Sequence, residues 1–246
     1  MKHLLLVIAT WLAFFGTSGA QNAQSQNAPG ETLHVGLYSE FRGFDIAKVK
    51  VLDPNTLNVA TAIMEPLFEY VYDGTSDATG RIVPRLALTF EEAPDRLSAI
   101  VHLRDGVKFH DGTPFNAAAV VYHFSRILDP ALGLGLAETI LEPLERVEAV
   151  DPLTVKFVLK RPWASLQSAL AISGSMNLIG SPTALAKDPD GFNRHPVGTG
   201  PFVFHEWKTG DRLVVDRNPN IGILRCPRSI ASCTASCRTA TLATRA

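Results

Sequence analysis

"LRDGVKFHDGTPFNAAAVVYHFSRILDP" occupies residues 103–130 and carries the turn and helix signals that decide the fold of this region. Its two Asp-Gly pairs, at Gly106 and Gly112, predict tight turns on either side of a short extended segment. Asn116 follows, and it is expected to cap an amphipathic helix over 117–128 that the Asp-Pro pair then ends. One face of that helix carries the apolar residues Val120, Val121, Phe124, Ile127 and Leu128. The stretch therefore predicts paired turns followed by a helix with one buried face.

Alternating apolar residues on both sides of this stretch predict strands. The alternation is found at 32–39, 97–103 and 153–159, and in a hairpin formed by 202–207 and 212–217. The stretch 57–72 has helical spacing in its first half, and Pro66 should end or kink the helix. Strands and helices do not alternate regularly, so the expected fold class is α/β without repeated βαβ units.

Composition bounds the protein class. The chain has 246 residues, of which 46% are hydrophobic and 19% charged, so it can bury one or two sizeable cores. The net charge of −1 hides an asymmetry, because residues 221–246 contain four arginines and no acid. The acidic remainder has no Lys/Arg cluster, and we therefore expect no nucleic-acid partner.

Residues 1–20 have the pattern of a secretory signal peptide. Lys2 and His3 precede an apolar run from residue 4 to residue 15, which ends in small residues up to Ala20. Residues 21–31 are polar and are expected to form a flexible lead. Residue 21 is glutamine, so the usual lipid-anchoring cysteine is missing there. The mature protein is expected to be soluble in an exported compartment.

Residues 103–130 resemble the most recognisable segment of the family 5 extracellular solute-binding proteins, whose pattern runs LR-x-G-V-x-F-H-D-G-x-P-F-x-A-x-D-V. Supporting stretches follow one another in the family's order at 63–70, 81–103, 147–163 and 195–220. The chain departs from the pattern at Ala119, where the family has an acid. That acid would complete a capping box, so its absence is expected to cost up to about 1 kcal/mol.

The resemblance implies a periplasmic receptor of an ABC importer. Such proteins have two lobes that close around a peptide or a related small solute and then present it to the permease subunits in the inner membrane. Residues 32–220 would form an incomplete first lobe of a type II-like binding protein, with the second lobe absent. Nickel complexes, opines and sugars remain alternative solutes, since the discriminating residues would lie mainly in the other lobe.

Residues 221–246 differ in composition from all that precedes them. They hold every cysteine of the chain: Cys226, Cys233 and Cys237. Reading the same segment in a shifted frame, with permissible codon choices, gives "YWDPALPPIDRIVYRIVPDRNTRYA", the continuation that the resemblance implies. We therefore expect a frameshift-derived, disordered tail. A metal site is the alternative, but C-x6-C-x3-C lacks paired C-x2-C spacing and a nearby histidine.

The expected ligand contacts are Glu40, Phe41 and Arg42, in the turn after the first strand. Ligand sites gather at strand ends and in exposed turns, although an ordinary solvated loop is the alternative here. Trp163 and Trp207 could stack on a ligand or could serve as packing residues.

Signals for an enzyme are missing from the sequence. It contains no G-x-S-x-G, H-E-x-x-H or P-loop motif. His102, His110 and His123 do not have metal-ligand spacing. The resemblance implies solute binding, and we expect no catalytic residues, cofactor or metal. A secreted hydrolase and a non-transport structural module are the alternatives, and turnover of a peptide panel would favour the hydrolase.

Overall fold

The computed structural model describes residues 32–37, 39–45, 54–71, 80–132, 139–171, 177–220 and 239–244, the last six as backbone only. The predicted signal peptide and flexible lead lie outside these residues. Within them, no helix combines the length and the apolar character needed to cross a membrane.

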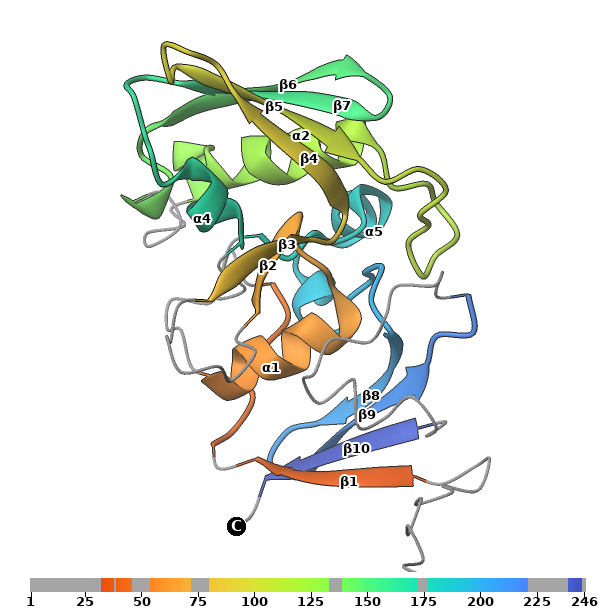
Figure 1. Ribbon diagram of the computed structural model, residues 1–246. Coiled ribbons are helices and arrows are strands. Elements are labelled where there is room, and N and C mark those ends of the chain that lie inside the picture. Colours follow the sequence, from red (N-terminus) through yellow and green to blue (C-terminus); the bar gives the residue numbers. More distant parts are fainter. Residues whose placement is uncertain are drawn as a thin grey trace, which may run out of the picture.

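A four-stranded antiparallel sheet forms one end of the molecule (Figure 1). Its order is β4 (Ala87–Glu92), β5 (Ser98–Leu103), β7 (Thr154–Leu159) and β6 (Leu144–Asp151). Buried and half-buried residues alternate along β5, as its sequence pattern predicts. The helix α2 (Ala117–Ile127) covers one face of this sheet and packs on β6 and β7.

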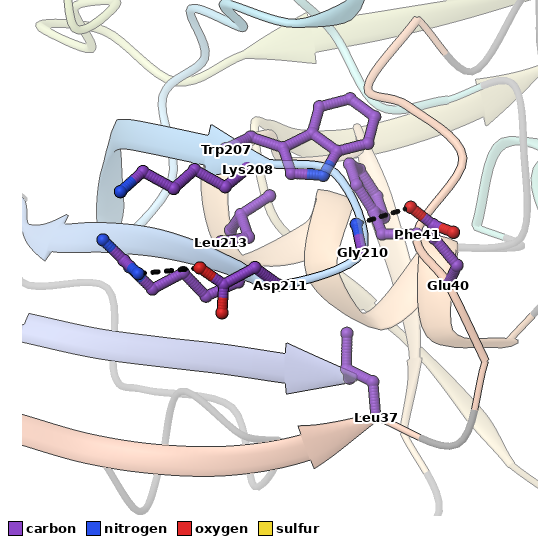
Figure 2. Close-up of a pocket in the computed structure, with 9 residues that line it drawn as sticks. Leu37, Glu40, Phe41, Trp207, Lys208, Gly210, Asp211 and Leu213 are labelled. Atoms are coloured by element: carbon purple, nitrogen blue, oxygen red, sulfur yellow. Dashed lines mark hydrogen bonds and ion pairs between the residues drawn. The ribbon is translucent and has the colours of Figure 1, made fainter. Parts of the chain in front are cut away.

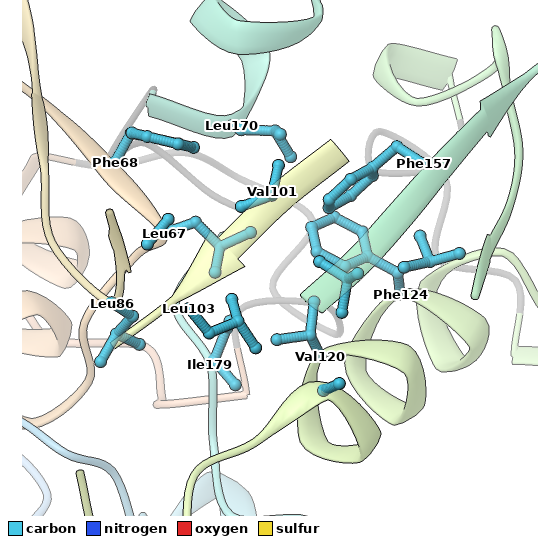
Figure 3. Close-up of a cluster of buried hydrophobic side chains, with 14 of the residues drawn as sticks. Leu67, Phe68, Leu86, Val101, Leu103, Val120, Phe124, Phe157, Leu170 and Ile179 are labelled. Atoms are coloured by element: carbon cyan, nitrogen blue, oxygen red, sulfur yellow. The ribbon is translucent and has the colours of Figure 1, made fainter. Parts of the chain in front are cut away.

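The first hydrophobic core lies between this sheet and α2 (Figure 3). Phe124 of α2 meets Phe157 of β7 edge to face, with ring centroids 5.2 Å apart, and both rings are fully buried. The short helix α4 (Leu166–Ala171) adds Leu166 and Leu170 to the same cluster. Burial of these large side chains, rather than helix propensity, stabilises this half.

The predicted helix after Asn116 is confirmed. Its first turn is capped by the Asn116 side chain, which accepts a hydrogen bond from the Ala119 N–H at 3.2 Å. Val121 and Leu128 are half-buried at the edge of the predicted face, and the other members are fully buried. Ala119 is only 3% exposed, so an acid there would lose its hydration. The cost of about 1 kcal/mol expected for the missing acid at position 119 rests on helix capping alone and does not include the cost of burying that acid.

A second sheet forms the other end of the molecule, with the order β1 (Thr32–Leu37), β10 (Thr239–Thr244), β9 (Arg212–Arg217) and β8 (Phe202–Lys208). The predicted hairpin of β8 and β9 is confirmed, and β1 and β10 are the only parallel pair among the described strands. The helix α1 (Pro54–Ile63) packs on β8, and the second hydrophobic core lies between them.

The strand β10 corrects the predicted disorder of the tail for six of its residues. Thr239–Thr244 fill the position between β1 and β9, where Val35 pairs with Leu242 and Leu242 pairs with Leu213. The sequence there is rich in threonine, which favours strands, and both neighbouring strands offer backbone hydrogen bonds. Residues 221–238 and 245–246 lie outside the described residues, and with them the three cysteines.

The middle of the molecule is a small antiparallel pair, β2 (Phe68–Val71) and β3 (Arg81–Pro84). The helix expected in the first half of 57–72 is confirmed as α1, which ends at Ile63 ahead of Pro66, and the chain after Pro66 forms β2. Short helical segments complete the described chain: α5 (Pro182–Lys187) and two 3-10 turns at Pro130–Leu132 and Gly191–Asn193. The fold is therefore mixed α/β, as expected, with mostly antiparallel sheets.

Candidate functional site

The turn after β1 brings Glu40 and Phe41 next to the β8–β9 hairpin (Figure 2), and Arg42 follows them in the chain. The Gly210 N–H at the hairpin tip donates a hydrogen bond of 2.9 Å to Glu40 Oε1. Gly210 has a φ of +74°, which favours glycine at this tip. The hollow between turn and hairpin is about 10 Å³, roughly the space of one water. It is too small for a solute, so a ligand would have to lie over the exposed surface.

Phe41 is buried, with 4% of its surface exposed. Its ring lies 4.9 Å from the Trp207 ring and 4.5 Å from the Phe44 ring. Trp207 is in turn covered by the Arg194 guanidinium, 4.0 Å from the ring centroid. The packing interpretation of Trp207 is therefore confirmed. Phe41 holds the turn against the second core, and its contact with a ligand stays a prediction.

Arg42 is exposed. Its backbone N–H donates to Thr56 Oγ1 at 3.3 Å, which fixes the main chain of the turn to α1. The guanidinium has no hydrogen bond or ion pair to any other described residue. Glu40 is also exposed, so the turn presents an acid and a base to solvent.

The next residues of the turn are held by distant parts of the chain. Arg126 at the end of α2 bonds both carboxylate oxygens of Asp45, at 3.0 and 2.5 Å, in a bidentate pair. The Asp45 N–H donates to Asn193 Oδ1 at 2.9 Å, and the Phe44 N–H donates to the Asn193 carbonyl at 3.1 Å. A Cβ on Gly43 would lie 2.1 Å from Asn193 Oδ1, so only glycine fits there. These contacts pre-organise the turn.

A buried polar cluster lies between the two cores. Glu65, directly after α1, is 7% exposed, and its Oε2 accepts a hydrogen bond of 2.9 Å from Thr199 Oγ1. Burial raises the pKa of Glu65 to about 7, against the lowering effects of that hydrogen bond and of Arg85 and Arg104. Sequence reasoning missed Glu65, although its place directly before Pro66 at the end of a helical pattern was visible.

Gly198 and Gly200, on either side of Thr199, contact the end of α1. A Cβ on Gly198 would lie 2.1 Å from the Ile63 carbonyl oxygen, and one on Gly200 would lie 2.7 Å from the same atom. The sequence predicted a tight bend here. The structure adds that both glycines are needed because two backbone segments approach closely.

His110 belongs to the same region and is held in one neutral form. Its Nδ1 accepts the Gly198 N–H at 3.4 Å, so Nε2 carries the proton and lies 3.0 Å from the Gly200 carbonyl. Burial lowers the pKa of His110, which agrees with that tautomer. Burial alone would raise the pKa of neighbouring Asp111, but hydrogen bonds from Ser181 and Thr113 bring it below its ordinary value.

The three histidines considered as metal ligands in the sequence have separate contacts. His102 lies 3.1 Å from Thr154 Oγ1 on the first sheet, and His123 is buried against Phe124. Within the described residues, no three His, Cys, Asp or Glu side chains are grouped to hold a metal ion. Trp163 packs at the edge of the first core, in agreement with the packing interpretation.

Residues 81–222 match the family model described as "Bacterial extracellular solute-binding proteins, family 5 Middle". The chain belongs to this family. Since these proteins bind solutes rather than transform them, the expectation of a non-enzymatic protein is confirmed. The family is extracellular or periplasmic.

Among curated relatives, the glutathione-binding protein GsiB of Pectobacterium atrosepticum is 31% identical over 207 residues, which are 84% of this chain and 38% of the relative. GsiB of Escherichia coli O1:K1 is 34% identical over 168 residues, 68% of this chain and 32% of the relative. The chain thus spans about a third of the length of these curated relatives.

Solved structures show the same fold. AgaA of A. tumefaciens R10, in complex with agropinic acid, has a TM-score of 0.74 and 30% identity, over 87% of this chain and 40% of that one. DppA of Helicobacter pylori, in complex with the peptide STSA, has a TM-score of 0.73 and 24% identity, over 90% and 44%. Both alignments cover nearly all of this chain and less than half of the relative.

Proposed function

We propose that this chain is the substrate-binding component of an ABC importer, in the form of a first lobe, and that it takes a peptide or a related small solute for delivery to permease subunits. The single observation that carries the proposal is the turn after β1, which is anchored at Asp45 and carries the exposed side chains of Glu40 and Arg42. Opposite charges at fixed positions suit the ammonium and carboxylate groups of a peptide.

The relatives bind different solutes, and they therefore support a class of solute rather than one compound. GsiB is a glutathione-binding protein, and DppA was solved with a short peptide. AgaA was solved with agropinic acid. Charged groups recur among these ligands. We propose the same general class here, with Glu40 and Arg42 as contacts and Phe41 as the support beneath them.

The test is calorimetric titration of the full chain with glutathione, a dipeptide, a tetrapeptide and an opine. One lobe can contact the solute only from one side, so we expect weak binding. Arg42→Gln should lower the affinity for the preferred solute about 10-fold, the loss of one charged hydrogen bond. Arg81→Gln is the matched control, because Arg81 is an exposed arginine on β3. Equal affinity in wild type and Arg42→Gln, or hydrolysis of any peptide, would contradict the proposal.

We propose also that residues 221–246 come from a shifted reading frame. The support is compositional: the shifted frame gives a family-like continuation, whereas the frame shown gives a cysteine- and arginine-containing segment. Resequencing the coding DNA across the Asn220 codon is the test. One additional base followed by an open frame is the expected result, and an unchanged sequence would remove the basis of the idea.

A further inference from the structure

A second, larger cavity lies apart from the turn after β1. It has a volume of about 980 Å³ and is lined by residues 104–110 and 218–220, with Glu65 and Thr199 in its wall. The loop 104–110 belongs to the connection between β5 and α2, which extends toward the second sheet in Figure 1. No residue of this cavity lines the hollow beside Glu40. The volume falls in the range of small-molecule sites.

The wall of this cavity contains a carboxylate with an unused oxygen. Within the described residues, the only hydrogen bond of the Glu65 side chain is the one that Oε2 receives from Thr199, which leaves Oε1 without a partner. Glu65 is more than nine-tenths buried, at 7% exposure. Oε1 is not sealed from solvent, because Glu65 lines the cavity, and a ligand N–H group there can bond it.

Positive groups line the same cavity. The Arg104 Nε donates to the Arg85 carbonyl at 3.1 Å, and its two terminal nitrogens have no partner among the described residues. Lys108 is exposed and forms no ion pair with the rest of the described chain. Arg85 also acts on Glu65, but its own charge is paired with Glu69. Two cations therefore remain available beside one buried acid.

We propose that this cavity binds a small zwitterion, an amino-acid-sized molecule whose ammonium group bonds Glu65 Oε1 and whose carboxylate faces Arg104 and Lys108. A simple amine would be repelled by the positive charges of Arg104 and Lys108. A simple carboxylate would be repelled by the negative charges of Glu65 and Asp105. Only a molecule with both charges satisfies both sides of the wall. His110 adds no charge, because it is neutral and bonded to Gly200.

Protonation of Glu65 should make the affinity for the zwitterion depend on pH. The pKa of Glu65 is raised to about 7, chiefly by burial, with Arg85, Arg104, Glu69 and Thr199 as the other groups that act on it. An ammonium ligand requires the ionised carboxylate. Affinity should therefore rise about 10-fold between pH 6 and pH 8 and then level off.

The test is calorimetric titration of the full chain with glycine, γ-aminobutyrate and ε-aminocaproate, which place the two charges at increasing separation. Butylamine and butyrate are the single-charge probes. We expect one of the amino acids to bind and both single-charge probes to bind at least about 10-fold more weakly. Glu65→Gln should reduce the affinity about 10-fold and remove the pH dependence, and Lys108→Gln should reduce it less. Circular dichroism checks that each variant is folded.

Arg81→Gln is the control for this site as well, because Arg81 is exposed on β3 and lines neither the cavity nor the smaller hollow. It should leave the zwitterion affinity unchanged, whereas Arg42→Gln tests the other proposal on its own. Three results would overturn the inference: no probe binds at millimolar concentration, butylamine binds as tightly as the amino acids, or Glu65→Gln retains wild-type affinity and pH dependence.

Discussion

Removal of the Arg126 side chain should destabilise the protein strongly, because it takes the opposite charge away from the buried Asp45 carboxylate. The Asp45 side chain is 3% exposed and that of Arg126 is 13% exposed, so water reaches the pair only from the arginine side. Loss of one member of such a pair costs about 3–5 kcal/mol. The partial exposure of Arg126 and the backbone contacts of Asn193 place Arg126→Met near the lower end, at about 3 kcal/mol.

Urea denaturation followed by circular dichroism measures this loss as a lower midpoint with an unchanged slope. The double variant Arg126→Met with Asp45→Asn removes both charges and should regain at least about 1 kcal/mol relative to Arg126→Met alone. A loss below about 1 kcal/mol in Arg126→Met, or no recovery in the double variant, would refute the reasoning that burial of the pair holds the turn after β1.

Three further changes test other parts of the structure. Phe124→Ala removes a fully buried ring and should cost about 3–5 kcal/mol in the free energy of unfolding, measured in urea. Asn116→Ala removes the cap of α2 and should cost about 1 kcal/mol in the same assay, with Asn116→Ser close to wild type. The folded-state pKa of Glu65 is about 7 against 4.5 unfolded, so its contribution to stability is present below pH 4.5 and is lost as pH rises to 7. Glu65→Gln should therefore gain about 3 kcal/mol over wild type at pH 8 and little at pH 4, as melting at both values would show.

The parts of the fold that sequence reasoning predicted are those with strong local signals. The α2 helix carries its cap, its apolar face and its stop within one short stretch, and β5 and β7 alternate cleanly. By contrast, β4 has exposed residues at most positions and contains two glutamates, so its pattern does not alternate and it was missed. It becomes a strand because β5 offers an unpaired edge.

The candidate site was predicted in the same partial way. The turn containing Glu40 and Arg42 follows directly from the end of β1, but no local pattern indicates that Arg126 and Asn193 reach it. Glu65 and Thr199 are likewise far apart in the chain, and only the close packing of two glycines against α1 brings them together. Such contacts form between residues far apart in the chain, and no fixed spacing in a single sequence indicates them.

The central place of β10 in the second sheet has a consequence for biosynthesis. Thr32 pairs with Thr239, so β1 emerges from the ribosome long before the strand that it needs exists. Until then β1 has no ladder neighbour among the described strands, since β9 lies on the far side of β10. The nascent chain must therefore carry β1 without its described ladder neighbour until residues 239–244 have been made, and an unpaired strand edge can pair with another chain.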